Sequence, residues 1–208
     1  FAGEMAVIVD HGMREMLVEQ KDVFYYVTLM NENYAQPSLP AGVEAEVICG
    51  CYKFNSYLPV SGKGDSTKTS KNVTLLGSGA ILTEVVKAAQ LLAAQGVAAE
   101  VFSVTSWSEL ARDGQACEQR ALAGDAAPGQ PFVAQQLQAG QGPVIAATDY
   151  VRAVPESIRA FVPAGRRYLT LGTDGFGRSD TRAALRGHFG VDAASIVRAA
   201  LHALTQRG

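Results

Sequence analysis

From Val73 onward, the sequence alternates apolar strand-like runs with helical patterns, and this alternation constrains the fold more than any other feature. Such short apolar runs are typical of strands buried on both faces. The runs are "VTLLG", "AAEVFSVTS", "PVIAATDY" and "RRYLTLGTD". Strands that alternate with helices form a sheet between two helical layers. We therefore predict an α/β domain over residues 72–208, with a three-layer, mostly parallel sheet and helices on both faces.

The helical patterns carry start and stop signals. Over residues 78–96 the apolar side chains recur on one helical face, and Gly96 is placed to end the helix in a left-handed turn. Ser108 stands in a capping position before another helical pattern, and Asp192 is the predicted N-cap of the last helix. These signals agree with the alternation described above.

The residues before this domain predict the end of a second α/β domain, residues 1–54. Apolar residues recur at helical spacing from Met5 to Leu17, and "VFYYVTLM" (residues 23–30) has the composition of a buried strand. The Ser-, Gly- and Lys-rich residues 55–71 have little to bury, so we interpret them as a linker or hairpin.

Composition and charge argue against several classes of partner. The net charge is −2 and the basic residues are scattered, so we expect no nucleic-acid surface. Apolar runs are shorter than the about 20 residues that a membrane-spanning helix needs, so we expect no membrane association. Cys49 and Cys51 are interpreted as buried strand thiols, and so few cysteines indicate a reducing compartment, the cytoplasm. The helical opening without Met or signal peptide predicts a fragment of a longer protein.

The glycine-rich stretch "LGTDGFGRSDTR" (residues 171–182) joins a predicted strand to a predicted helix, where a phosphate loop would lie. It lacks the third glycine of the dinucleotide fingerprint, because Asp180 stands there after Gly175-x-Gly177. A carboxylate at this place would repel an anionic phosphate. We interpret the loop as structural, with Gly175 and Gly177 forming the turn and Ser179 or Asp180 capping the helix.

Other chemical arrangements are weakly supported. A second glycine turn at residues 77–79 also lacks the third glycine and predicts a tight turn. His11, His188 and His202 fall in helical runs, and none has a clear Ser, Cys or Asp partner beside it. Asp174 has no partner ligands, so we predict no metal site.

The most suggestive segment is "LMNENYAQP" (residues 29–37). Glu32 and Tyr34 follow a predicted buried strand, where they could hydrogen-bond a substrate or carry a proton. Composition by itself favours the other interpretation, a capped turn.

Five longer stretches cover nearly the whole chain: "VFYYVTLMNENYAQPSLP", "VTLLGSGAILTEVVKAAQLLA", "VFSVTSWSELARDGQACE", "AATDYVRAVPESIRAFVPA" and "LGTDGFGRSDTRAALRGHFGVDAASIVRAAL". Taken in order, they resemble the C-terminal part of the homodimeric bacterial pyruvate dehydrogenase first component, a thiamine diphosphate-dependent, transketolase-like family. The resemblance implies that residues 1–54 end a pyrimidine-binding domain and that residues 72–208 are a transketolase-type C-terminal domain.

The resemblance also implies an activity, cofactors and partners. The family is a homodimer that decarboxylates pyruvate with thiamine diphosphate and Mg²⁺ and passes the acetyl group to the lipoyl acyltransferase component. This chain contains no G-D-G…N motif, and the glutamate that activates the cofactor belongs upstream of Phe1. We expect no cofactor on this fragment, no activity from it alone, and a mainly structural, dimer-supporting role.

One family position falls inside the chain. Some members carry "NENYH", whose histidine lines the substrate channel, whereas this sequence has Ala35 there. Alanine cannot donate a proton, so the role of the histidine is not transferred. Glu32, Tyr34 and Ala35 are candidate substrate-channel residues by position, and no catalytic or cofactor-binding residue is assigned.

Two other functions stay open. A free-standing anion- or nucleotide-binding α/β module would use residues 172–180 or 77–79. Another transketolase-type enzyme would act on a different 2-oxo acid or ketose donor.

Overall fold

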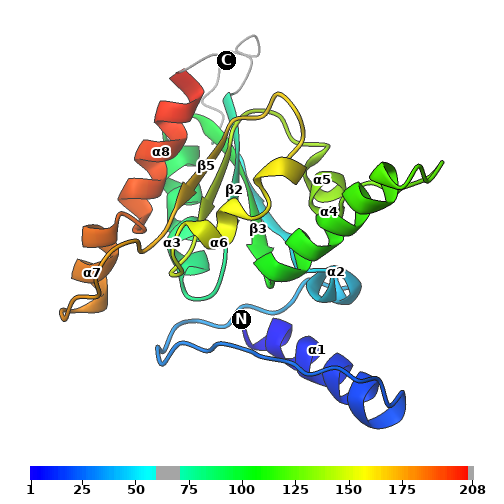
Figure 1. The fold of residues 1–208 in the computed structure, drawn as a ribbon. Helices are drawn as coiled ribbons and strands as arrows, with labels where there is room; N and C mark the ends of the chain where they lie inside the picture. Colours follow the sequence, from blue (N-terminus) through cyan, green and yellow to red (C-terminus); the bar gives the residue numbers. More distant parts are fainter. Residues whose placement is uncertain (60–70, 206–208) are drawn as a thin grey trace.

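The computed structural model describes residues 1–59 and 71–205. Its strands are β1 (Cys51–Tyr57), β2 (Lys71–Gly77), β3 (Val97–Val104), β4 (Val144–Ala147) and β5 (Tyr168–Leu171). They form one sheet in the order β1-β3-β2-β4-β5 (Figure 1). All neighbouring pairs are parallel except β1, which runs antiparallel to β3 at one edge. The prediction of a mostly parallel sheet is confirmed.

Helices cover both faces of this sheet, as predicted. The described helices are α1 (Ala2–Met13), α2 (Glu44–Ile48), α3 (Ile81–Ala94), α4 (Trp107–Leu122), α5 (Phe132–Leu137), α6 (Ala153–Glu156), α7 (Arg182–Phe189) and α8 (Ala193–Thr205), with a π-helical turn (Arg14–Val18) and a 3₁₀ turn (Arg159–Phe161). Among these described helices, none has the length and apolar character needed to cross a membrane.

The two helical layers enclose two separate cores. α3 and α8 lie over one face of the sheet, and α4 and α5 lie over the other (Figure 1). Successive side chains of β2 point to opposite faces, so Leu75 joins the α3–α8 core and Leu76 joins the α4–α5 core. Because the central strands bury both faces, their sequences are continuously apolar.

The predicted helix ends are confirmed in part. Gly96 has φ +80° just beyond α3, and the Asp192 carboxylate accepts a hydrogen bond at 2.9 Å from the third backbone N–H of α8. The prediction of Ser108 as a cap was wrong. The Ser106 side chain caps α4 instead, accepting a backbone N–H at 3.1 Å, because the helix already begins at the buried Trp107.

The predicted domain boundary after residue 54 falls inside β1. Asn55, Ser56 and Tyr57 pair with residues 99–101 of β3, so they belong to the sheet and not to a linker. Residues 60–70 of the predicted linker lie outside the described residues. The division of the chain into two domains stays a prediction.

Only one of the two neighbouring cysteines is a buried strand thiol, contrary to the prediction for both. Cys49 ends α2 and is exposed, whereas Cys51 begins β1 and is fully buried. Gly50, with φ +101°, turns the chain between them, and a Cβ there would approach the Ser106 carbonyl oxygen to 2.7 Å. Burial raises the pKa of the Cys51 thiol and keeps it protonated.

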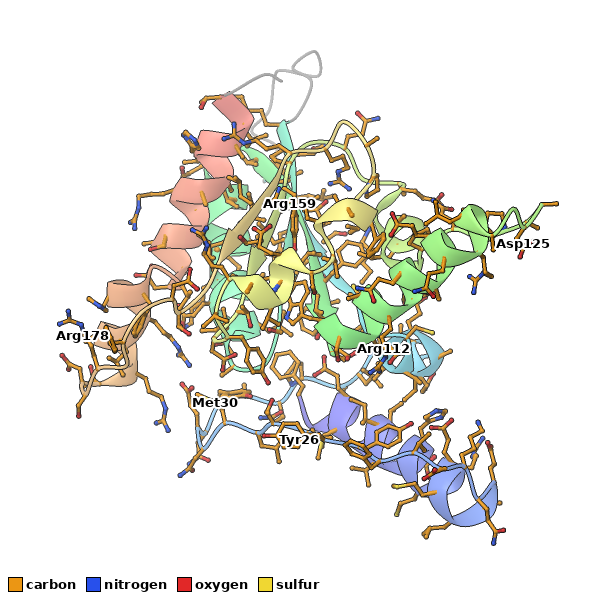
Figure 2. The ribbon with its side chains drawn as sticks, viewed as in Figure 1. Tyr26, Met30, Arg112, Asp125, Arg159 and Arg178 are labelled. Carbon is orange, nitrogen blue, oxygen red and sulfur yellow. The ribbon has the colours of Figure 1, made fainter. Side chains whose placement is uncertain are left out.

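Residues 23–30 do not form the buried strand that their composition predicted. In the described structure this segment is extended without a paired strand, and Phe24 and Tyr26 are 88% and 86% exposed. Figure 2 shows Tyr26 and Met30 on this segment, away from the sheet. A strand needs a neighbour for its hydrogen bonds, and composition does not supply one.

The predicted helix before this segment is confirmed as α1, and a buried carboxylate attaches it to the sheet. Glu4 of α1 accepts a hydrogen bond from the Tyr52 hydroxyl at 2.9 Å and another from the Ser103 hydroxyl. Tyr52 and Ser103 are cross-strand partners in β1 and β3. Burial, and then the charge of Glu4, raise the pKa of Tyr52, so its hydroxyl stays a hydrogen-bond donor.

Candidate functional site

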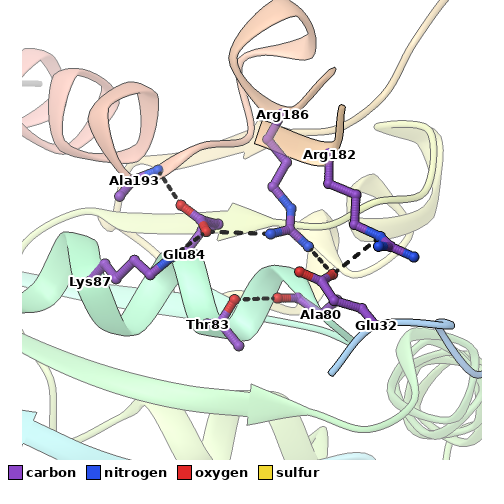
Figure 3. Close-up of polar contacts among 8 residues, drawn as sticks. All are labelled: Glu32, Ala80, Thr83, Glu84, Lys87, Arg182, Arg186 and Ala193. Carbon is purple, nitrogen blue, oxygen red and sulfur yellow. Dashed lines mark hydrogen bonds and ion pairs between the residues drawn. The ribbon is translucent and has the colours of Figure 1, made fainter. Parts of the chain in front are cut away.

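The loop with the candidate channel residues lies against α7 (Figure 3). The Glu32 carboxylate accepts a hydrogen bond from the Arg186 guanidinium, and its Oε2 lies 3.8 Å from Nε of Arg182. The Arg182 guanidinium also donates to the Asn31 carbonyl oxygen. The two arginines lie one helical turn apart, so α7 presents both cations to the same loop.

Arg186 contacts a second carboxylate on the opposite side from the loop. Its Nη1 lies 3.5 Å from Oε1 of Glu84, a buried residue of α3. Glu84 also accepts hydrogen bonds from Nζ of Lys87 at 2.8 Å and from the backbone N–H of Ala193 at 3.1 Å. Ala193 opens α8, and a carboxylate is favoured at a helix N-terminus. Glu84 therefore joins three helices around Arg186 (Figure 3).

Tyr34 lies half-buried beside the same charges. Its ring packs edge-on against Phe1, with 6.1 Å between the ring centroids. Burial raises the pKa of the Tyr34 phenol, and the carboxylates of Glu32, Glu4 and Asp149 raise it further. The phenol therefore stays protonated at neutral pH and can donate a hydrogen bond, but cannot act as a base.

Ala35, the third candidate, is exposed and offers no polar side chain. The structure thus brings Glu32 and Tyr34 into one charged environment and leaves Ala35 at its margin. Their assignment to a substrate channel stays a prediction.

The carboxyl ends of β2 and β4 lie at the point where the strand order reverses. Ligands of α/β sheets commonly bind at such a point. Here the hydroxyls of Ser78 and Thr148 are 2.7 Å apart and both residues are buried. Asp149 follows, and burial raises the pKa of its carboxyl, while a hydrogen bond to its own backbone and the charge of Arg186 lower it. The arrangement offers hydrogen-bonding groups and balanced charges.

The glycine-rich loop connects β5 to α7, but the N-cap predicted for that helix is wrong. The Thr181 hydroxyl accepts the hydrogen bond from the backbone N–H of Ala184 at 3.3 Å, so Thr181 is the N-cap of α7. Asp180 instead accepts from the Thr181 N–H at 2.6 Å, and Ser179 lies outside the helix. Gly175 turns the chain with φ +96°. The cap moves because the helix begins two residues after Asp180.

Asp174 and Gly177 of the same loop also have structural environments. The Asp174 carboxylate accepts the backbone N–H of Arg152 at 2.8 Å and pairs with its guanidinium at 3.3 Å. A Cβ at Gly177 would meet open space. Through Asp174 the loop after β5 is therefore bound to the segment after β4. Helix α7 follows the loop and places Arg182 and Arg186 beside Glu32.

The remaining candidates do not assemble into a catalytic centre. His11 lies 3.6 Å from Glu15, His188 packs edge-on against Phe189, and His202 is on a separate helix. Across residues 1–59 and 71–205, no group of three or more His, Cys, Asp and Glu side chains could hold a metal ion.

The turn at residues 77–79 packs β2 closely against α3. A Cβ at Gly77 would approach a methyl carbon of Val85 to 2.9 Å, and Gly79 has φ +53°. Gly77 allows this close packing and Gly79 allows the left-handed turn, in agreement with the tight turn that the sequence predicted.

The sequence alone did not point to the arginines of α7 as site residues, nor to Glu84 as their second carboxylate. Arg182 and Arg186 are spaced at i and i+4, which puts them on one helix face. Glu84 lies among the apolar residues of the α3 core face, where an unpaired carboxylate would be costly. A carboxylate in that position indicates that a basic side chain lies beside it in the folded chain, but the sequence does not show which one.

Family models match the chain in two parts. Residues 63–192 match the transketolase-like TK C-terminal domain, and residues 1–37 match the pyruvate dehydrogenase E1 component middle domain. A solved structure, transketolase from Leishmania mexicana, covers 79% of this chain and 19% of its own length with a TM-score of 0.50 and 19% identity. At this identity the likeness concerns the fold alone.

Three curated relatives are similar along the whole chain. All are named pyruvate dehydrogenase E1 component. The relative from Cupriavidus necator is 48% identical over 210 residues, the one from Pseudomonas aeruginosa 47% over 210 residues, and the one from Escherichia coli (strain K12) 46% over 211 residues. Each alignment covers 100% of this chain but only 22%, 23% and 22% of the respective relative. The chain thus spans less than a quarter of their length.

Proposed function

Because the chain belongs to the family of the transketolase-like TK C-terminal domain, we propose that it works as a segment of a pyruvate dehydrogenase first component. The observation that carries this proposal is the 48% identity over the whole chain to a pyruvate dehydrogenase E1 component. A match to the fold family alone would not separate this function from that of other transketolase-type enzymes. The middle-domain match at residues 1–37 further supports the more specific assignment.

In this proposal the complete protein decarboxylates pyruvate and transfers the acetyl group to a lipoyl carrier. It does so as a cytoplasmic homodimer that works with a lipoyl acyltransferase component, at the step that follows glycolysis. Thiamine diphosphate with Mg²⁺ supplies the carbanion chemistry when bound. The support for this reaction, its cofactors and partners is the family resemblance of the sequence.

We assign the described residues no role in binding the metal. They contain no group of acidic, His or Cys side chains that could hold a metal ion. The sequence also lacks a G-D-G…N motif. We therefore assign no cofactor contact and no reaction step to residues of this chain.

The role proposed for this chain is structural. Its loop with Glu32 and Tyr34 is the part that we propose to lie near the site of reaction. Its sheet and two cores form a scaffold, and α7 holds the loop with Glu32 and Tyr34. The exposed apolar residues 23–30 offer a surface that suits packing with further protein.

The proposal is tested by comparing the complete protein that contains this segment with the 208-residue chain alone. Each is supplied with pyruvate, thiamine diphosphate, Mg²⁺ and a lipoyl-domain acceptor, and acetylated lipoyl groups are measured by mass spectrometry. We expect acetyl transfer from the complete protein and none from the chain alone.

Two outcomes would contradict this proposal. Acetyl transfer by the isolated chain would show that it carries the catalytic apparatus. A complete protein that ignores pyruvate but acts on ketose phosphates would instead be a different transketolase-type enzyme.

A further inference from the structure

We propose that Arg186 is a positioning residue that latches the loop of residues 31–35 onto the C-terminal domain, and that substrate handling by this loop depends on the latch. The Arg186 latch denotes the contacts of Arg186 with Glu32 and Glu84. The functional half of this inference rests on the proposed function, whereas the latch itself is a property of the structure.

Burial distinguishes the Arg186 contact from ordinary surface ion pairs. The side chains of Arg186 and Glu32 are 14% and 18% exposed, and their groups are joined by a hydrogen bond. Arg182, which also faces Glu32, is 52% exposed and lies 3.8 Å away. Exposed pairs contribute little because water and salt screen them, whereas removing one partner of a shielded pair is costly. Arg186 is therefore the main cation holding Glu32.

Glu84 fixes Arg186 in the orientation that the latch needs. The guanidinium lies between two carboxylates, with Nη2 toward Glu32 and Nη1 toward Glu84 (Figure 3). Glu84 is held in turn by Lys87 and by the first backbone N–H of α8. A planar guanidinium can bridge two such groups, which a lysine ammonium does less well. The latch thus connects the loop to α3, α7 and α8.

The loop has few other attachments to the C-terminal domain. It belongs to an extended segment without a paired strand in the described structure. In the described structure its other polar contacts to that domain are made by Arg182, which lies 3.8 Å from Glu32 and donates to the Asn31 carbonyl oxygen. Just before the loop, Thr28 makes a hydroxyl contact with Tyr150. Loss of the Arg186 latch would leave two carboxylates near one another and would free the side of the loop that carries Glu32.

Hydrogen exchange tests the latch without depending on activity. In the complete protein, peptides covering residues 29–37 are followed by mass spectrometry for wild type, Arg186→Gln and Glu84→Gln. We expect exchange in the loop to become about tenfold faster in Arg186→Gln, since hydrogen bonds to charged groups are among the stronger ones. Glu84→Gln should give a smaller increase because Glu32 keeps its partner.

Arg112→Gln is the matched control. Arg112 pairs with Glu109 on α4, is 68% exposed and lies away from the loop (Figure 2). Hydrogen exchange in residues 29–37 of the Arg112→Gln variant should equal that of wild type. If a folded Arg186→Gln protein also exchanges these residues at the wild-type rate, the latch is refuted. If Arg186→Gln does not fold, Glu84→Gln decides, and unchanged loop exchange in that variant would overturn the proposal.

Steady-state kinetics test the functional half. With pyruvate, we expect kcat/KM to fall about tenfold in Arg186→Gln, as expected for a displaced substrate-contacting loop. Arg186→Lys should recover part of the loss because it keeps the charge, and Arg112→Gln should match wild type. Faster loop exchange with unchanged kcat/KM would refute the functional half. A wild-type protein inactive toward pyruvate would contradict the proposed function and leave the exchange test of the latch intact.

Discussion

At the scale of single residues, Asp149 shows how burial and nearby charge oppose one another. The residue follows β4 at the carboxyl edge of the sheet. Burial raises the pKa of its carboxyl, and this effect exceeds the lowering by its own backbone hydrogen bond and by Arg186. A raised pKa means that the folded chain binds this proton more tightly than the unfolded chain. Ionisation of Asp149 therefore costs stability as the pH rises above the ordinary carboxyl pKa of about 3.9.

Asp149→Asn should stabilise the chain at neutral pH. The amide keeps the shape of the carboxyl and removes the charge that burial disfavours. The gain should shrink as the pH falls through about 3.9, because Asp149 then becomes protonated in the unfolded chain as well as in the folded chain. Denaturant titrations at pH 7 and pH 4 measure the difference. A variant less stable than wild type at pH 7 would show that the carboxylate makes a favourable contact that outweighs its burial.

At the scale of elements, α4 illustrates a local preference that tertiary packing overrides. Gly114 lies in the middle of this 16-residue helix, where glycine is unfavourable by about 1 kcal/mol relative to alanine. The Phe161 ring of the 3₁₀ turn occupies the space that a Cβ at residue 114 would need. The glycine therefore allows the helix and the turn to approach closely, which the sequence did not reveal.

Two glycine-to-alanine changes should act in opposite directions. Gly114→Ala should lower the free energy of unfolding by about 1–3 kcal/mol because the methyl group overlaps Phe161. Gly187→Ala should raise it by about 0.5–1 kcal/mol, since Gly187 is an exposed residue of α7 whose Cβ would have ordinary contacts. Urea unfolding followed by circular dichroism compares the two. A stabilising effect of both changes would show that Phe161 moves aside at no cost.

At the scale of the whole molecule, the apolar side chains divide into two populations. One fills the two cores on the faces of the sheet. The other lies on the surface between Val9 and Met30 and includes Leu17, Phe24 and Tyr26. Contiguous exposed apolar surface of this kind marks an interaction site. The N-terminal segment therefore offers a surface for association, and further exposed apolar side chains, such as Leu122 and Phe176, lie on the sheet domain.

We expect the 208-residue chain to associate through this surface. Sedimentation velocity should show a mass that grows with concentration, and the double change Phe24→Ser and Tyr26→Ser should reduce that growth because both side chains are almost fully exposed. Leu122→Ser is the control, since this leucine is also exposed but lies at the end of α4. If the mass of the double variant grows with concentration as much as that of wild type, the chains associate through another surface.

Much of the sheet domain could be predicted because its signals are local. The apolar runs correspond to β2 through β5, and Asp192 and Gly96 were placed correctly at helix ends. Such features depend on residues within a few positions of one another. The cap of α7 was misplaced by one or two residues because Ser179, Asp180 and Thr181 all suit an N-cap, and only the start of the helix selects between them.

The sequence by itself determined the α/β class, the order of strands β2 to β5 and the family of the chain. Tertiary structure alone decided that β1 joins the sheet, that residues 23–30 pair with no strand in the described part of the chain and that Glu32 meets Arg186. The physical reason is distance along the chain. Periodicity and capping act between near neighbours, whereas strand pairing and the Arg186 latch join residues that are far apart in sequence and become neighbours only when the chain has folded.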